Sequence, residues 1–181
     1  MPAFKNNYLI IALVVLLLFS FGFNNQPEEY TIKGVLLEKI STLIEWPDLV
    51  DNSHKDKFIV GIYGKHEFGN SLEEIYSERK IQNKNVVVKY IEKYSEINDC
   101  RVLFIPKLSN EQLKEVLEFV RKKPVLTISE IDGYAEKGVH VNFYTEGENI
   151  RFEINENSVK ESGISMNHLL LSLAKIVRTR K

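Results

Sequence analysis

The side chains that could bind a metal or activate a nucleophile are few and widely separated in this sequence. The four histidines, His54, His66, His140 and His168, have no partner at an i, i+4 spacing and no H-E-x-x-H motif. Metal ions such as zinc need several convergent ligands, so this spacing predicts no metal site. The single cysteine, Cys100, can form neither an internal disulfide nor a cysteine-based zinc site. It begins an apolar stretch, and we expect it to be buried as a small apolar side chain.

The motifs that mark hydrolases and nucleotide-binding proteins are also missing from the sequence. No G-x-S-x-G motif supplies an exposed serine nucleophile. Residues 61–64 lack the Lys-Ser/Thr of a phosphate loop and the G-x-G-x-x-G of a dinucleotide site. Gly64 could still present free N–H groups to an anion, although a tight strand-to-helix turn is the simpler explanation. The sequence therefore predicts a protein that is not an enzyme and that needs no cofactor.

The densest group of polar side chains lies in two alternating stretches near the C-terminus. In each stretch polar residues alternate with valine, isoleucine or phenylalanine, which predicts a β-hairpin with one polar face. The polar face is either a recognition patch for a ligand or protein, or a solvated surface with an Arg–Glu cross-strand network; the solvated surface is the commoner case. The residues on this face are His140, Asn142, Tyr144, Arg151, Glu153 and Asn155.

Three further candidate binding residues stand where predicted strands or helices end. Trp46 precedes the proline that stops the first predicted helix, so its ring either completes the core or contacts a partner. His66 and Phe68 follow the first predicted strand. Together with residues 106–109 and 129–133, this segment would line a crevice at the carboxyl ends of parallel strands, where α/β proteins bind small ligands.

Strand and helix patterns alternate along most of the chain. This alternation predicts an α/β fold: a three-layer Rossmann-like sandwich with a mainly parallel sheet, a C-terminal antiparallel hairpin at the sheet edge and helices on both faces. Apolar, β-branched runs predict strands at 58–63, 85–91, 102–105 and 125–129. Helical periodicity predicts helices at 31–44, 67–77, 111–121 and 166–177, with a short one starting near Glu156.

The first residues have the form of a secretory signal. Lys5 is followed by an uncharged apolar stretch at 8–19, and the small residues Ser20 and Gly22 are spaced as around a cleavage site. An uncleaved anchor is the alternative, although the apolar stretch is shorter than the ~20 residues that span a bilayer. We therefore expect a signal peptide at 1–22, a polar linker at 23–29 and a single exported domain at 30–181.

The charge balance argues against one class of partner. The chain has 24 Lys and Arg against 25 Asp and Glu, for a net charge of -1. Nucleic-acid binding needs a clearly basic face, so we expect no nucleic-acid partner.

Several short motifs, in order, resemble one known family. The sequence is similar in this respect to the YfiR/HmsC family of periplasmic regulators. The matching segments are L-I-E-W-P at 43–47, I-Y-G and F-G at 62–69, C-R-V-L-F-I at 100–105, P-V-L-T-I-S and G-Y-A-E-K-G at 124–138, V-N-F at 141–143, R-F-E-I-N at 151–155 and the apolar stretch at 165–177.

The resemblance implies a function and its partners. Family members lack known catalytic residues, form dimers and restrain a membrane-bound diguanylate cyclase through its periplasmic region, which limits cyclic-di-GMP and biofilm formation. Relatives also occur beside histidine kinases, so a small-ligand-binding accessory protein of such a receptor is the alternative. The chain departs from the best-known members, which carry additional cysteines in disulfides, because it keeps only Cys100. The expected partners are thus a membrane signalling protein, a second copy of the chain and possible small-molecule ligands.

Overall fold

The computed structural model describes residues 26–47, 56–64, 68 and 70–179. The predicted signal peptide at 1–22 and the start of the predicted linker lie outside the described residues. None of the helices formed by the described residues has the length and apolar character of a membrane span.

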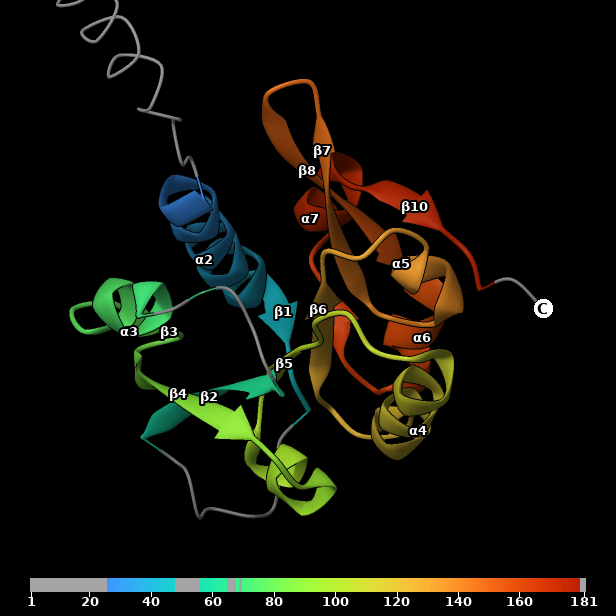
Figure 1. Ribbon diagram of the computed structural model, residues 1–181, viewed down its shortest axis with the longest axis horizontal. Helices are drawn as coiled ribbons and strands as arrows, with labels where there is room; N and C mark the ends of the chain where they lie inside the picture. Colours follow the sequence, from blue (N-terminus) through green and yellow to red (C-terminus); the bar gives the residue numbers. More distant parts are fainter. Residues whose placement is uncertain (1–25, 48–55, 65–67, 69, 180–181) are drawn as a thin grey trace, which may run out of the picture.

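The centre of the fold is an eight-stranded sheet in the order β10-β8-β7-β6-β5-β2-β4-β3. The neighbours from β4 to β7 run parallel, β3 runs antiparallel to β4, and β8 runs antiparallel to β7 but parallel to β10. The predicted mainly parallel sheet is therefore confirmed (Figure 1). The strands are β2 Lys57–Tyr63, β3 Lys80–Ile81, β4 Lys84–Ile91, β5 Val102–Phe104, β6 Leu126–Ser129, β7 Val141–Glu146, β8 Asn149–Asn155 and β10 Lys175–Val177.

Helices cover both faces of this sheet, as predicted. One core contains Leu37 of α2 and Leu72 of α3, and the other contains Leu113 of α4 and Ile97 of η1. A separate two-stranded sheet joins β1 Ile44–Glu45 to β9 Ser165–Met166. The helices are α2 Gln26–Thr42, α3 Ser71–Tyr76, η1 Tyr94–Asp99 (a 3-10 helix), α4 Asn110–Val120, α5 Tyr134–Lys137, α6 Glu156–Glu161 and α7 His168–Leu173.

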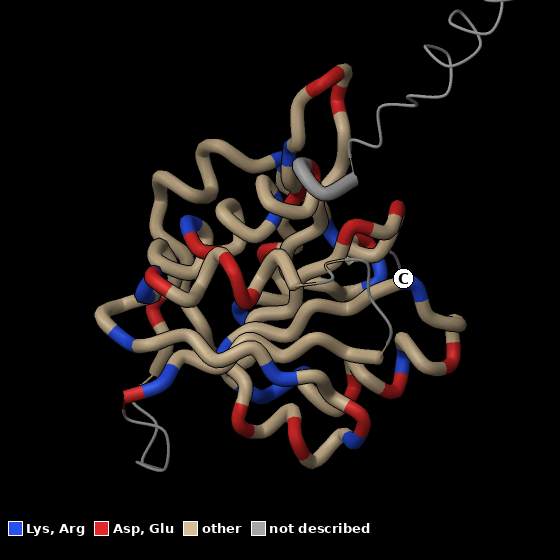
Figure 2. The backbone as a smooth tube through the Cα atoms, turned by 60° about the vertical axis from the view of Figure 1, so that its left-hand side comes forward, with Lys and Arg blue, Asp and Glu red and all other residues tan. Residues whose placement is uncertain are grey.

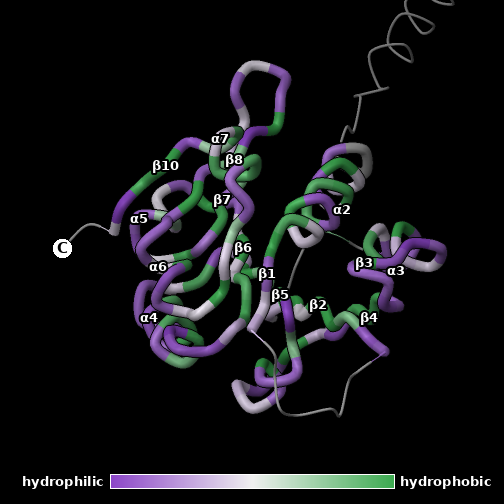
Figure 3. The backbone as a smooth tube through the Cα atoms, turned by 180° about the vertical axis from the view of Figure 1, so that it is seen from behind, coloured by the Kyte–Doolittle hydropathy of each residue, from purple (hydrophilic) through white to green (hydrophobic). Residues whose placement is uncertain are grey.

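The buried side chains alternate between these two cores along each central strand. In β2, Val60 and Ile62 face the core under α2, whereas Ile59 faces the core under α4. A strand buried on both faces needs a continuous apolar run, and residues 58–63 provide one. Figure 3 shows the hydrophobic colour running through the central strands between the two helical layers.

Cys100 and Gly61 are in close contact inside this sheet. A Cβ built on Gly61 would lie only 2.6 Å from the Cys100 Sγ, so the thiol occupies the space that a side chain at position 61 would need. Cys100 is buried and free, which confirms its prediction as a small apolar side chain. Burial raises the pKa of its thiol to about 12.

Helix α4 begins where the sequence predicted. The Ser109 side chain accepts a hydrogen bond from the Gln112 backbone N–H at 3.2 Å, and the Gln112 side chain accepts from the Ser109 N–H at 3.1 Å. This reciprocal pair is a capping box, which satisfies backbone donors that have no partner within the helix.

The first helix differs from its predicted range of 31–44. It begins at Gln26, inside the segment predicted as a linker, because Pro27 falls in the first turn, where a missing N–H costs no hydrogen bond. It ends at Thr42, and the chain then extends to pair Ile44 with Met166 of β9. The interstrand hydrogen bond from the Asn167 N–H to the Leu43 carbonyl, at 3.0 Å, extends this pairing.

The prediction of one long C-terminal helix at 166–177 was wrong. Met166 belongs to β9, α7 is confined to His168–Leu173, and β10 then runs beside β8. Ala174 is extended, with φ -97° and ψ 151°, so the chain leaves the helix there. The β-branched residues Ile176 and Val177 suit a strand as well as a helical stripe, and pairing with β8 decided between them. The hairpin β7–β8 consequently lies one strand inside the sheet edge, instead of at the edge.

Acidic and basic residues are scattered over the whole chain without segregating to one side. Figure 2 shows Lys and Arg interspersed with Asp and Glu throughout the fold. This distribution agrees with the nearly balanced charge count.

Candidate functional site

The polar face of the hairpin is largely buried, so the expected solvated surface was wrong. His140, Asn142, Glu153 and Asn155 are buried, whereas Arg151 remains exposed. Helix α5 packs against β7 and β8 and covers this face. The alternation within the hairpin could not show this cover, because α5 and Thr179 lie outside the hairpin.

Asn155 ties three segments together beneath that cover. Its Nδ2 donates to the Ala135 carbonyl of α5 at 2.7 Å and to Thr179 Oγ1 at 2.8 Å. Its Oδ1 accepts from the Ser158 N–H at 3.1 Å and so caps α6. A fully buried amide that uses all these groups has a structural role, and it is not accessible to a partner.

His140 is held in a similar way. The Thr127 N–H donates to His140 Nδ1 at 3.1 Å, and the His140 N–H donates to Thr127 Oγ1 at 2.9 Å. Burial lowers the pKa of His140 to about 4, although a backbone hydrogen bond with Ser158 opposes this effect. His140 lines a hollow of about 730 Å³ between α4 and α6 as a neutral side chain.

The other polar residues of the hairpin are linked by contacts that run from buried Asn142 through Glu153 to exposed Lys175. Lys175 Nζ of β10 lies 3.1 Å from Glu153 Oε2 and 5.6 Å from the centre of the Tyr144 ring. The hydrogen bond and charge of Glu153 raise the pKa of Lys175. The Asn142 Nδ2 lies 3.5 Å from Glu153 Oε1, while its Oδ1 is buried without a hydrogen-bond partner.

Arg151 forms an Arg–Glu pair across the two strands, but with Glu146 of β7 and not with another of the six candidates. Its Nε lies 3.4 Å from Glu146 Oε2 at the end of the hairpin. Arg151 faces Tyr144 across the strands, two pairs further along than Asn142 and Glu153. The six hairpin candidates therefore do not make one accessible recognition patch.

Phe68 is a core residue, and Trp46 is half-buried against the same core. The Trp46 ring packs edge-on against Phe58 with centroids 5.4 Å apart, which favours the core interpretation over an exposed partner contact. Phe68 is buried between Tyr30 and Phe104, with centroids at 5.0 Å and 4.8 Å. His66 lies outside the described residues, so its predicted binding role stays a prediction.

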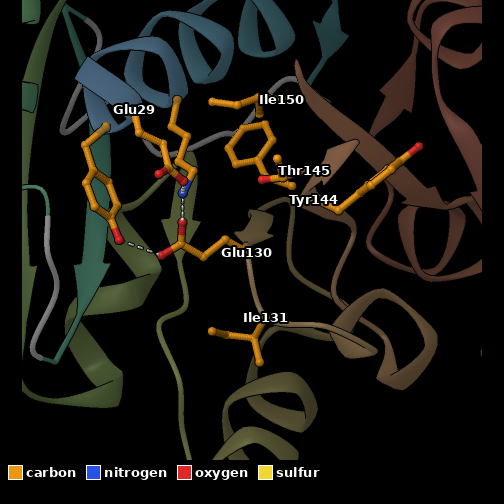
Figure 4. Close-up of a pocket in the computed structure, with 9 residues that line it drawn as sticks. Glu29, Glu130, Ile131, Tyr144, Thr145 and Ile150 are labelled. Carbon is orange, nitrogen blue, oxygen red and sulfur yellow. Dashed lines mark hydrogen bonds and ion pairs between the residues drawn. The ribbon is translucent and has the colours of Figure 1, made fainter. Parts of the chain in front are cut away.

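A pocket of about 360 Å³ lies at the carboxyl ends of β6 and β7, in the part of the fold where a ligand crevice was expected. Glu130 and Ile131, from the predicted 129–133 segment, line it (Figure 4). The first turns of α2 and the hairpin β7–β8 form its other walls. Residues 106–109 of the expected crevice do not line this pocket.

Lys33 is the central charge of this pocket. Its ammonium forms an ion pair with Glu130 and another with Glu29, 2.5 Å away on the same helix. The Tyr30 hydroxyl donates to the other oxygen of Glu130 at 3.0 Å. Burial alone would lower the pKa of Lys33, but its hydrogen bonds and charge interactions with Glu130 and Glu29 raise it above its usual value.

The sequence carries one signal for this cluster. Lys33 lies between Tyr30 and Leu37 at helical spacings, and both of those residues are buried. A lysine on the apolar side of a helix needs a buried acidic partner, because an unpaired charge is costly there. That partner, Glu130, could not be identified without the fold.

A second surface feature consists of large apolar side chains exposed at one end of the sheet. Leu169 and Leu173 of α7 are 56% and 64% exposed, and Ile176 of β10 is 46% exposed. We name these three residues the α7–β10 patch; Figure 3 shows both elements at the same end of the sheet. Among the described residues no strand pairs with the outer side of β10. The patch therefore combines apolar surface with unpaired backbone groups.

The described residues contain no group of three or more His, Cys, Asp or Glu side chains close enough to hold a metal ion. The structure thus offers two candidate binding features, the pocket around Lys33 and the α7–β10 patch.

Comparison with known proteins gives one family and distant structures. A protein-family model described as YfiR/HmsC-like matches residues 30–175. No curated protein matches the chain.

Two solved structures illustrate the distant likeness. A conserved domain protein from Vibrio cholerae O1 biovar eltor is 10% identical, with a TM-score of 0.49, 81% of this chain covered and 59% of that one. An ABC domain from Streptococcus pneumoniae, solved in complex with L-Trp, is 11% identical, with a TM-score of 0.48, 69% of this chain covered and 56% of that one. The chain thus spans less than two thirds of the length of either protein.

Proposed function

The chain belongs to the YfiR/HmsC-like family of periplasmic regulators, and from this premise we propose that it docks on a membrane-bound signalling enzyme and restrains it. The proposed partner is a diguanylate cyclase, whose product cyclic-di-GMP promotes biofilm formation. In this proposal the chain acts by binding and has no catalytic activity of its own.

The observation that carries the proposal is the α7–β10 patch. Three large aliphatic side chains in water are costly, and covering them would stabilise a complex by roughly 25 cal/mol for each Å² of apolar surface buried. The open edge of β10 adds backbone donors and acceptors that an extended segment can pair with. We therefore propose that an extended segment of the cyclase's periplasmic region is the occupant of this edge.

Docking would restrain the enzyme by a shift in its conformational equilibrium. A bound regulator stabilises whichever state of the receptor it binds more tightly, by the difference between its two binding free energies. The regulator thus needs an affinity difference between the active and inactive states, and it needs no reactive side chain.

The test combines a gene deletion with patch variants. Deletion of the gene is expected to raise cellular cyclic-di-GMP and surface attachment, and the wild-type chain is expected to reverse both. Leu173→Glu and Ile176→Glu place a charge in the apolar patch. In the deletion strain these variants are expected to leave cyclic-di-GMP and surface attachment high. Val87→Glu, at an exposed apolar position on β4 near the opposite end of the sheet, is the matched control and is expected to act as wild type.

The same variants can be followed by direct binding. The tagged mature wild-type chain is expected to capture the cyclase from detergent-solubilised membranes, and the Leu173→Glu chain is expected to capture at least about tenfold less. Unchanged cyclic-di-GMP in the deletion strain would reject the cyclase as partner. Capture of a histidine kinase in its place would support the receptor-accessory alternative.

The homodimer implied by the family resemblance stays a prediction. Light scattering of the purified mature chain tests it, and a monomer at all accessible concentrations would contradict it. Measuring Leu173→Glu beside wild type shows whether the α7–β10 patch also joins two copies of the chain.

A further inference from the structure

We propose that the pocket between α2, the segment after β6 and the hairpin β7–β8 binds a small organic cation, a protonated amine attached to an apolar or aromatic group. The inference goes beyond docking on a membrane enzyme, because it assigns a ligand site on a different part of the surface. The α7–β10 patch contributes no residue to the pocket.

The first argument is the shape and lining of the pocket. Its volume of about 360 Å³ falls within the range of small-molecule sites, roughly 300–1,000 Å³. Ile131 and Ile150 supply apolar surface for the hydrocarbon part of a ligand, and the buried ring of Phe143 lies behind them. Six of the nine lining residues carry a polar or charged side chain, so the pocket is suited to a ligand that has a polar group beside its apolar part.

The second argument is the charge balance around Lys33. One ammonium faces the two carboxylates of Glu29 and Glu130, so the cluster carries a net charge of about -1 when all three are ionised. Lys33 is almost fully buried, and its charge is already matched by these partners. The uncompensated charge of the pocket is therefore negative, and it attracts a cation.

The third argument identifies where the ligand's ammonium binds. Glu130 is 20% exposed, and its oxygens accept from Tyr30 and from Lys33. Glu29 is 42% exposed and, among the described residues, forms an ion pair with Lys33 alone. A carboxylate has about four acceptor positions, so Glu29 keeps capacity for a second donor at the pocket mouth. Figure 4 shows Glu29 and Glu130 on the same side of the pocket, with Ile150 and Thr145 across from them.

The same geometry disfavours an anionic ligand. A carboxylate or phosphate would have to displace Glu29 from Lys33 and would then face the charge of Glu130. A neutral ligand would gain the apolar contacts but would leave Glu29 without its second donor. The pocket should thus discriminate among molecules of similar shape by their charge.

The experiment uses the purified mature chain and three probes that share one ring. Tyramine carries an ammonium, 4-ethylphenol carries no charge, and 3-(4-hydroxyphenyl)propionate carries a carboxylate. Isothermal calorimetry is expected to show saturable binding of tyramine, with 4-ethylphenol at least about tenfold weaker and the carboxylate weaker still. Isoamylamine, which keeps the ammonium and lacks the ring, is expected to bind as well.

Two variants place the binding in this pocket. Glu29→Gln is expected to weaken tyramine binding at least about tenfold while leaving 4-ethylphenol unchanged. Thr145→Trp fills the pocket mouth and is expected to block the binding of tyramine and of 4-ethylphenol. Glu118→Gln is the matched control, because Glu118 also pairs with a lysine four residues away, Lys114, on an exposed helix surface.

Three results would overturn the inference: no saturable binding of either amine, equal binding of the three ring probes, or equal effects of Glu29→Gln and Glu118→Gln. These results are independent of the docking proposal, which is measured by membrane capture with patch variants. A chain that captures the cyclase and binds no amine would refute the ligand site alone.

Discussion

Lys33 and Glu130 form an ion pair across 97 positions of the sequence, and this pair joins the first helix to the carboxyl end of β6. Both residues line the pocket. Glu130 follows Ser129, the last residue of β6, so a rigid strand end positions the carboxylate.

The Lys33–Glu130 pair leads to a prediction about stability. Lys33→Met leaves two carboxylates close together without their cation, and we expect a loss of about 3 kcal/mol in the free energy of unfolding. Adding Glu130→Leu to that variant should recover part of the loss, because it removes a partly buried carboxylate that has lost its cation. Urea unfolding followed by circular dichroism measures both, and Lys114→Met in the exposed Lys114–Glu118 pair should change little. Equal effects of the two lysine substitutions would contradict the assigned burial.

His140 predicts a pH-dependent stability. Burial lowers its pKa from 6.5 to about 4, so the unfolded chain binds a proton between these values that the folded chain does not bind. At pH 7 the residue is neutral in both states; as pH falls from 6.5 towards 4, stability decreases by up to about 3 kcal/mol. Urea titrations of wild type and His140→Gln across this range measure the difference, and the variant should lack this part of the decrease. Parallel pH profiles would show that other groups cause the loss.

The close approach of Gly61 and Cys100 predicts a coupled pair of substitutions. Gly61→Ala places a methyl group 2.6 Å from the Cys100 Sγ and 3.1 Å from Ile91, and we expect it to cost about 2 kcal/mol. Cys100→Ala removes the sulfur and leaves a small void. The double variant should therefore be more stable than the sum of the two single effects predicts, which is the signature of direct contact. Strict additivity would place the strain of Gly61→Ala elsewhere.

Cys100 also predicts a chemical property. The thiolate is the reactive form, and burial both raises the pKa of this thiol to about 12 and limits reagent access. A thiol reagent such as Ellman's reagent should modify the native chain at neutral pH far more slowly than the chain unfolded in guanidinium chloride. Rapid stoichiometric reaction of the native chain would show that position 100 is accessible.

The parallel centre of the fold was predictable because its signals are local. A strand buried on both faces needs an uninterrupted apolar run, and the runs at β2 and β5 meet that condition. The capping box at Ser109 and Gln112 is equally local, since four consecutive residues contain the whole signal. Burial of Cys100 followed from its residue type and its place at the start of a strand.

The candidate site was less predictable because its partners are distant in sequence. The alternation around Asn142 and Glu153 located one polar face, but α5 and the segment near Thr179 decide that this face is buried. Likewise, the apolar pattern around Ile176 fits a strand and a helix equally well, and the segment is a strand because it pairs with β8. Lys33 marked an unusual position, while only the three-dimensional structure supplied Glu130.

The attachment of β10 has a consequence for how the molecule opens. Three residue pairs join this strand to β8, whereas seven join β2 to β4. Peeling away the outermost strand therefore breaks few hydrogen bonds, and its amide protons should exchange with solvent much earlier than those of the sheet interior. Each time β10 detaches, the backbone edge of β8 that pairs with it is exposed, and a strand from another chain can then pair there.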